Sequence, residues 1–181
     1  MQKKIIITGA PSTGKSSIIQ HLKTRGYLCM DEISREVILQ ARKEGIEHLF
    51  ISSPILFSEI LLEKRLYQYQ QAKKTEEAIV FFDRGIIDIM AYLNFSKTSH
   101  NIDFNKALKE IKYDIVFICP PWQTIHKTDN ERYESFNQAK EIHTKLVESY
   151  QKEGHKVIVV PFGTVEERTH FIENYISIVR P

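Results

Sequence analysis

The sequence predicts a three-layer α/β fold in which helices cover both faces of a five-stranded parallel sheet. Five short runs rich in Ile, Val and Phe have the length and composition of strands that are buried on both faces. Stretches of helical period lie between these runs, and strands that alternate with helices in this way pair in parallel. The predicted strands are residues 4–8, 27–31, 79–83, 115–119 and 157–160.

The helices are indicated by apolar periodicity and by residues typical of helix ends. Apolar residues recur at helical spacing after the first strand, in residues 18–22, and before the fifth, in residues 136–150. Gly26 and Gly154 follow helical runs and are typical C-terminal stops. Helix starts are predicted at Ser53-Pro54 and at residues 164–167, where Thr-Val-Glu-Glu forms a capping box.

Length and composition favour one domain that spans residues 1–181. Apolar residues make up 42% and charged residues 27%, as in ordinary soluble proteins. No apolar run approaches the roughly 18 residues of a membrane-spanning helix, and the start of the chain is unlike a signal peptide, so a cytoplasmic location is expected. A formal charge of +2 gives no reason to expect a nucleic-acid partner.

Residues 9–16, Gly-Ala-Pro-Ser-Thr-Gly-Lys-Ser, match the phosphate-binding P-loop. The motif follows a predicted strand and opens a predicted helix, so backbone N–H groups and the helix dipole converge on the phosphates. Lys15, a predicted catalytic residue, is expected to reach the β- and γ-phosphates of ATP or GTP, with ATP favoured, and the Ser16 hydroxyl to bind Mg²⁺. The predicted nucleotide-binding residues are Gly9, Pro11, Ser12, Thr13, Gly14, Lys15, Ser16 and Ser17.

A second motif ends the third predicted strand. The strand runs into Asp83, the form of the second metal-handling motif of P-loop enzymes, so Asp83 is predicted to be catalytic and to bind Mg²⁺ with Ser16. Arg84 follows where motor-type ATPases commonly place a Glu that orients the attacking water. Small-molecule kinases use such an Asp-Arg pair, in which the Arg grips a phosphate or an anionic acceptor. The alternative is a helix-capping Asp beside a solvated Arg.

A pair of acids, Asp31-Glu32, follows the second predicted strand. In the strand order 2-3-1-4-5 of many P-loop kinases, this strand lies at the sheet edge on the acceptor side. There Glu32 could act as the general base toward an acceptor hydroxyl, and Arg35, one turn further on, could hold a charged group. The alternative is a helix that carries favourable acids in its first turn.

Residues 128–132, Thr-Asp-Asn-Glu-Arg, lie between the fourth strand and a long helix, where P-loop kinases carry a lid over the nucleotide. Arg132 is the candidate lid arginine and a predicted catalytic residue. It would neutralise charge as the γ-phosphoryl group moves and would help to exclude water. The alternative is a charged surface loop. Residues 161–164, after the fifth strand, lie where this superfamily often surrounds the base.

Together these motifs resemble a P-loop family labelled as an AAA-type domain, similar to the ribosylnicotinamide kinase part of NadR proteins. The resemblance covers nearly the whole chain, through the segments IIITGAPSTGKSSII, DEISREVI, VFFDRGIID, YDIVFICPPW, TDNERYESF and VPFGTVEERTHFI. It implies a kinase-like fold, because the sensor arginines and the helical lid domain of a ring-forming AAA motor are not found. The family also includes proteins similar to the TRPL translocation defect protein, thought to bind GTP and phosphoinositides.

Two hypotheses follow. The first is an Mg²⁺-dependent kinase that transfers the γ-phosphoryl group of ATP to a small hydroxylated acceptor, such as a nucleoside, bound by Glu32, Arg35 and Arg84. The second is a nucleotide-dependent switch or slow NTPase that binds a protein or lipid partner through the rather apolar segment 33–75. For that segment, packing of two helices over the sheet is the alternative.

Overall fold

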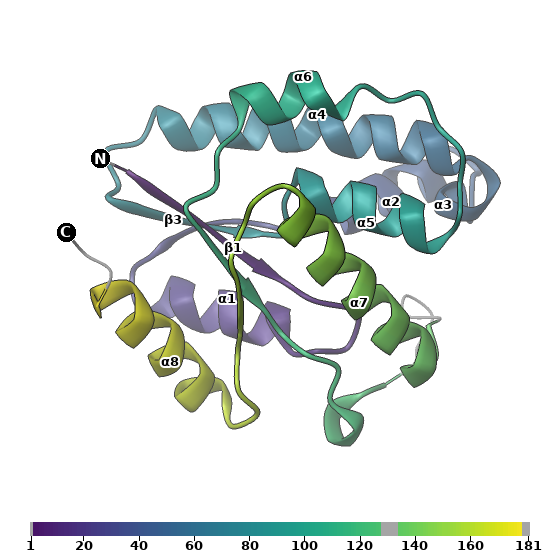
Figure 1. The fold of residues 1–181 in the computed structure, drawn as a ribbon. Coiled ribbons are helices and arrows are strands. Elements are labelled where there is room, and N and C mark those ends of the chain that lie inside the picture. The colour runs from purple at the N-terminus through teal and green to yellow at the C-terminus, as the bar shows by residue number, and fades with distance from the viewer. Residues whose placement is uncertain (1, 128–133, 179–181) are drawn as a thin grey trace.

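The computed structural model describes residues 2–127 and 134–178 and contains a five-stranded sheet between two layers of helices (Figure 1). The strand order is β2-β3-β1-β4-β5 and every strand pair is parallel, which confirms the predicted order and fold class. The strands are β1 (Lys3–Thr8), β2 (Leu28–Met30), β3 (Ile79–Asp83), β4 (Ile115–Ile118) and β5 (Val157–Val159).

The helices divide between the two faces of the sheet. Helices α1 and α8 cover one face, and α4, α5 and α7 lie on the other, with α2 and α6 packed in the same layer (Figure 1). The described helices are α1 (Lys15–Thr24), α2 (Ile33–Lys43), α3 (Leu49–Ser52), α4 (Pro54–Lys73), α5 (Ile86–Phe95), α6 (Phe104–Glu110), the 3₁₀ turn η1 (Gln123–Ile125), α7 (Phe136–Lys152) and α8 (Val165–Ile178).

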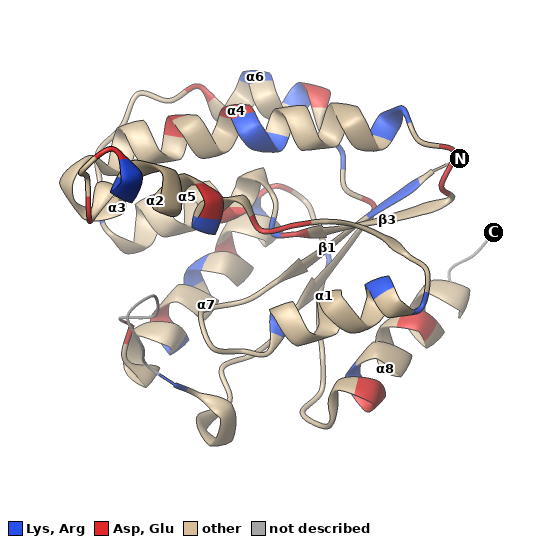
Figure 2. Ribbon diagram, turned by 180° about the vertical axis from the view of Figure 1, so that it is seen from behind, with Lys and Arg blue, Asp and Glu red and all other residues tan. Residues whose placement is uncertain are grey.

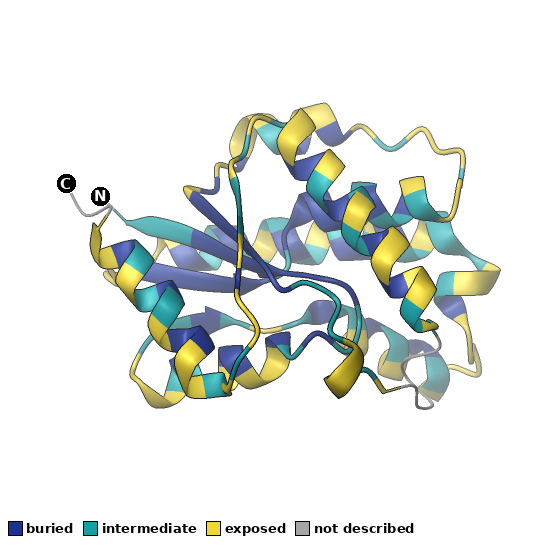
Figure 3. Ribbon diagram, turned by 60° about the horizontal axis from the view of Figure 1, so that its bottom comes forward, coloured by how far each residue is buried: buried dark blue, intermediate teal, exposed yellow. Residues whose placement is uncertain are grey.

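Each face of the sheet carries its own apolar cluster. Along β1, Ile5 and Ile7 belong to the cluster under α1 and α8, whereas Ile6 belongs to the cluster under α4, α5 and α7. This alternation follows from the two-residue period of a strand. Ile5, Ile6 and Ile7 are all fully buried. Figure 3 shows the central strands as a buried layer between helices whose outer faces are exposed. A strand covered on both faces must be apolar at every position, which explains the continuous Ile and Phe runs.

Segment 33–75 forms three helices, whereas the packing alternative considered from the sequence had two. Gly45, with a φ of +85°, follows the end of α2, and its N–H donates to the Arg42 carbonyl. The short α3 comes next, and α4 starts afresh at Pro54, which is tolerated only in the first turn of a helix. Ser53 occupies the N-cap position of α4 but makes no side-chain capping bond.

Acidic and basic residues both occur along the helices in the view of Figure 2, in keeping with the small net charge. Within residues 2–127 and 134–178, none of the helices combines the length and hydropathy needed to cross a bilayer.

Candidate active site

The P-loop joins β1 to α1 at the carboxyl edge of the sheet. Gly9 has a φ of +147°, and a Cβ there would lie 2.4 Å from the Cys119 carbonyl oxygen, so no side chain fits. Gly14, with a φ of +81°, is the N-cap of α1. The first turn of α1 therefore directs its free backbone N–H groups toward the loop, an arrangement that binds anions.

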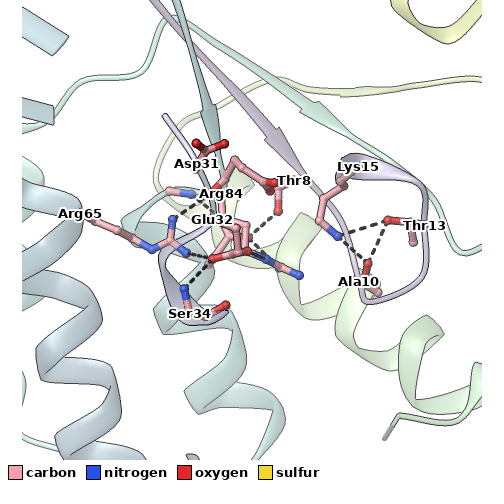
Figure 4. A network of polar contacts seen from close by, with 12 residues as sticks. Thr8, Ala10, Thr13, Lys15, Asp31, Glu32, Ser34, Arg65 and Arg84 are labelled. Atoms are coloured by element: carbon pink, nitrogen blue, oxygen red, sulfur yellow. Dashed lines mark hydrogen bonds and ion pairs between the residues drawn. The ribbon is translucent and has the colours of Figure 1, made fainter. Parts of the chain in front are cut away.

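Lys15 is buried at the start of α1 and lies over the P-loop (Figure 4). Its Nζ donates to the Ala10 carbonyl at 2.8 Å and lies 3.4 Å from Thr13 Oγ1. Burial, with Arg84 nearby, lowers the pKa of Lys15 to about 8, although Asp83 acts in the opposite direction. The ammonium group thus has the neutral oxygens of Ala10 and Thr13 as its hydrogen-bond partners within the P-loop.

The Glu32 carboxylate lies between two arginines (Figure 4). Arg84 Nε is 2.5 Å from Oε2, Arg65 Nη2 is 3.1 Å from Oε1, and the Ser34 N–H donates to Oε1 at 3.1 Å. Burial raises the pKa of Glu32, but the two guanidinium groups and the Ser34 N–H outweigh this effect and hold it at about 2. Glu32 is therefore both the N-cap of α2 and an ionised group of the site.

Asp83 lies at the end of β3 and is 5% exposed. Its Oδ1 has no hydrogen-bond partner among the described residues. Burial, followed by the charge of Glu32, raises its pKa to about 6. An orphaned carboxylate oxygen beside a P-loop fits Mg²⁺, which takes one or two protein oxygens together with water and phosphate. Asp83 and Ser16 therefore have the donor atoms for this ion.

The described ranges contain no group of three or more His, Cys, Asp or Glu side chains arranged to hold a metal ion. Mg²⁺ commonly relies instead on substrate phosphates and water for most of its ligands, so a site with Ser16 and Asp83 as protein ligands is chemically sufficient.

Arg84 is held by a buried carboxylate that sequence reasoning missed. Asp88, 2% exposed, lies 3.2 Å from Arg84 Nη1. It also accepts hydrogen bonds from Thr8 Oγ1 at 2.5 Å, the Gly85 N–H at 2.8 Å and the Tyr150 hydroxyl at 2.6 Å. Arg84 itself has a φ of +71°, a left-handed conformation that is uncommon for a residue with a side chain and is often found at functional sites. Asp88 thus fixes the turn that carries Arg84.

A cavity of about 990 Å³ connects these groups, a size at the upper end of small-molecule sites. Among the predicted site residues, it is lined by residues 11–17, Glu32, Arg35, Asp83 and Arg84. Gly9, the first residue of the loop, packs against Cys119 and is not among the residues that line the cavity. Arg132 lies outside the described residues.

The cavity has two chemically different ends. Beyond the P-loop, the segments after β4 and β5 meet where the Trp122 and Phe162 rings lie 5.0 Å apart. Thr124, Ile125 and residues 163–165 line this end. On the side of α2, α4 and α5, the lining includes the apolar and aromatic side chains of Ile38, Phe57, Leu61, Tyr92, Leu93 and Phe95, together with the polar Ser34, Arg35, Arg42 and Ser58.

Sequence reasoning also missed Arg65 and Arg168, which are both 3% exposed and line the cavity. The sequence contained a signal for both residues, because each is a charged residue at a position that helical periodicity places on the buried side of its helix. Arg168 precedes Ile172 and Ile176 at a spacing of four residues, and Asp88 interrupts the apolar run of α5. A charge at such a position must be paired or bind a ligand.

Comparisons with solved structures agree with this architecture. Deoxyadenosine kinase from M. mycoides with bound dATP has a TM-score of 0.70 at 20% identity, over 96% of this chain and 99% of that one. Thymidylate kinase from Candida albicans has a TM-score of 0.70 at 16% identity, over 98% and 92%. NadR protein in complex with NR has a TM-score of 0.71 at 19% identity, over 97% of this chain and 49% of that one. The three proteins share the fold described above.

No curated protein matches the sequence. A family model described as an AAA domain matches residues 4–168, a range that contains the P-loop, Glu32, Asp83 and Arg168. The strand order of this chain, β2-β3-β1-β4-β5, is that of the kinase-like P-loop fold. This chain belongs to the AAA domain family.

Proposed function

We propose that this protein is a kinase that transfers the γ-phosphoryl group of ATP to a hydroxyl group of a small, neutral, nucleoside-like acceptor. The observation that carries the proposal is the ionised Glu32 carboxylate, fixed by Arg65 and Arg84 in the wall of the cavity that the P-loop also lines. The likeness of the fold to deoxyadenosine kinase and NadR supports the same reading.

At the phosphate end, the N–H groups of the first turn of α1 and the Lys15 ammonium bind the triphosphate. Ser16 and Asp83 would hold Mg²⁺, which would supply positive charge to offset that of the phosphates. Arg132 is retained in this proposal as the lid arginine on the strength of its sequence position. Positioning and charge stabilisation supply most of the catalysis of phosphoryl transfer.

At the acceptor end, Glu32 accepts a hydrogen bond from the acceptor hydroxyl. This hydrogen bond orients the hydroxyl oxygen toward the γ-phosphorus. Because its pKa is held at about 2, Glu32 stays ionised and takes the proton only as the new O–P bond forms. Arg84 is already bonded to Glu32 and Asp88, and Arg65 to Glu32. Charges balanced in this way suit a neutral acceptor better than one that carries its own phosphate.

The apolar end of the cavity provides room for the rest of the acceptor. Phe57, Tyr92 and Phe95 line it, and aromatic walls of this kind favour a flat ring. Arg35 lines the same end and is proposed to donate hydrogen bonds to the acceptor.

The test is turnover of ATP and GTP with Mg²⁺, alone and with nucleosides, nucleoside monophosphates and sugars, with Lys15→Ala as the blank. The expected result is that a nucleoside accelerates nucleotide turnover and is converted to its monophosphate, whereas nucleoside monophosphates have no effect. Tight nucleotide binding with slow turnover that no acceptor changes would favour the switch. The observation behind that second candidate is the exposure of Ile51 (66%) and Leu56 (49%) in segment 33–75.

A further inference from the structure

A third buried arginine lines the cavity, and its charge is not compensated within the described residues. Arg168 is 3% exposed, and its Nε and Nη2 are enclosed and have no hydrogen-bond partner there. Arg65 and Arg84, by contrast, form ion pairs with carboxylates. No described carboxylate forms an ion pair with Arg168. Arg168 thus differs from the two arginines around Glu32.

The packing of α8 places this guanidinium against the P-loop. The capping box at Thr164 and Glu167 starts the helix, with hydrogen bonds of 2.8 and 3.2 Å, and the Arg168 N–H donates to the Thr164 carbonyl at 3.1 Å. A Cβ on Gly14 would lie 2.6 Å from Arg168 Nη1. Because Gly14 has no side chain, the guanidinium has room to lie next to it, directly before Lys15 in the P-loop.

A charge in this position is costly unless a ligand meets it. An arginine cannot lose its proton in a protein, so Arg168 cannot escape the cost of burial by becoming neutral. Its Nη1 is the guanidinium nitrogen at the P-loop, 2.6 Å from where a Cβ on Gly14 would lie, and the charged N–H groups of arginine form strong hydrogen bonds with phosphate oxygens. The N-terminus of α1, which Gly14 caps, also favours an anion at this place.

We propose that Arg168 binds the phosphate chain of the nucleotide, as a second cation that α8 supplies to the P-loop beside Lys15. The uncompensated charge of the ligand-free protein is then paired when the nucleotide binds. This inference rests on the proposed function only in that the cavity holds a nucleoside triphosphate, and it is independent of the acceptor.

The test is equilibrium binding of ATP, AMP, adenosine and inorganic tripolyphosphate, each with Mg²⁺, to the wild type, Arg168→Met and Arg168→Lys. Arg168→Met is expected to weaken ATP and tripolyphosphate binding by about tenfold or more, as for the loss of a charged hydrogen-bonded pair, with adenosine unchanged. Arg168→Lys should retain part of the affinity because it keeps the charge. The matched control is Arg25→Met. Arg25 lies on the surface and forms an ion pair with Glu173, which is on α8, the helix that also carries Arg168.

The panel separates the possible failures. A loss for adenosine and ATP but not for tripolyphosphate would assign Arg168 to the base and overturn the proposal. Unchanged ATP affinity in Arg168→Met, with a wild type that binds ATP, would overturn the proposal and leave the proposed function standing. A wild type that binds neither nucleotide nor tripolyphosphate would overturn both.

Thermal unfolding distinguishes binding from mere support of the loop. A phosphate-binding Arg168 predicts that ligand-free Arg168→Met is at least as stable as the wild type, since an uncompensated buried charge is gone, while the rise in Tm with ATP shrinks. A supporting role predicts a lower ligand-free Tm and a normal rise with ATP, which would overturn the proposal. Arg65→Met is the comparison for a paired guanidinium, and its ligand-free Tm should fall. If Arg168→Met does not fold, ligand binding by Arg168→Lys decides: weaker binding of ATP and tripolyphosphate with adenosine unchanged supports the proposal, and unchanged binding of ATP and tripolyphosphate overturns it.

Discussion

At the scale of single residues, the site is a set of buried charges whose neighbours decide their protonation. Glu32 and Asp83 are both carboxylates near Lys15, yet the pKa of Glu32 is lowered to about 2 and that of Asp83 is raised to about 6. The difference arises because Glu32 is in direct contact with Arg65 and Arg84, whereas Asp83 is buried next to the charge of Glu32. Environments that separate two acids in this way are typical of sites with two chemical roles.

Glu32→Gln is expected to lower kcat for phosphoryl transfer by about 10²- to 10⁴-fold, the usual contribution of a general base. Nucleotide binding should remain, because the P-loop is unchanged. The measurement is the rate of acceptor phosphorylation together with ATP affinity. Asp31→Asn is the matched control, since Asp31 is adjacent, its side chain is 69% exposed, and it pairs with Lys23 at the surface. A Gln variant with the full rate would remove the assignment of Glu32 as the base.

Asp83→Asn is expected to remove a pH-dependent loss of stability. Burial and Glu32 raise the pKa of Asp83 from 3.8 to about 6, so between these values the folded protein holds a proton more tightly than the unfolded chain. Stability therefore falls as the pH rises through this range, by up to roughly 3 kcal/mol. Glu32 acts in the opposite sense, since its stabilising effect is present above pH 4.5 and is lost as the pH falls toward 2.

The measurement for Asp83→Asn is the free energy of unfolding in urea between pH 4.5 and 7, without Mg²⁺ or nucleotide. The advantage of the variant over the wild type should grow as the pH rises. Parallel curves for the two proteins would contradict the assignment of the raised pKa to Asp83.

At the scale of elements, one carboxylate links three of them around the site. Asp88, on α5, accepts hydrogen bonds from Thr8 at the end of β1, from the Gly85 N–H before α5, and from Tyr150 on α7. The donors lie up to 80 residues away in the chain, and Thr8 directly precedes the P-loop. The position of Arg84 relative to the P-loop is thus set by contacts between elements.

Asp88→Asn is expected to destabilise the fold by about 2–4 kcal/mol, because it removes a charge and places an amide N–H₂ among donors in a buried site. It should also lower kcat, since Arg84 loses a partner. Urea unfolding and phosphorylation kinetics measure the two effects. Asp103→Asn, at the exposed N-cap of α6, is the control and should change stability little because Asn is as good a cap. An equally small effect at Asp88 would show that the hydrogen-bond hub is dispensable.

At the scale of the whole molecule, the sheet separates two apolar clusters that have no residue in common. Ile142 of α7 lies in the cluster on one face and Ile172 of α8 in the cluster on the other, and both are fully buried. The sites on the carboxyl edge draw residues from both layers, since Arg65 and Asp88 come from one face and Lys15 and Arg168 from the other. The sheet therefore fixes the position of the residues from one helical layer relative to those from the other.

Ile142→Val and Ile172→Val are each expected to cost about 0.5–1.5 kcal/mol of stability. Because the sheet lies between the two side chains and they share no cluster, the double variant should lose the sum of the two within about 0.5 kcal/mol. Urea unfolding of the four proteins measures this. A larger coupling energy would mean that strain passes through the sheet from one cluster to the other.

Much of the fold was predictable because its determinants are local. A strand buried on both faces must be a continuous apolar run, and all five runs became strands in the expected order. The P-loop is contiguous in sequence, and Asp83, Arg84 and Glu32 directly follow strands whose ends meet at one edge. The number of helices in segment 33–75 was less predictable, because a single glycine and a Ser-Pro pair decide it.

The sequence by itself determined which residues follow the strands, and hence which functional groups gather at the carboxyl edge of the sheet. Only the tertiary structure decided their partners. Arg65 meets Glu32 across 33 residues, Tyr150 meets Asp88 across 62, and Arg168 reaches Gly14 from the last described helix. Periodicity reveals that a charged side chain will be buried, but the group that it meets depends on how two distant helices pack, and that packing is set by the sum of many contacts across the sheet.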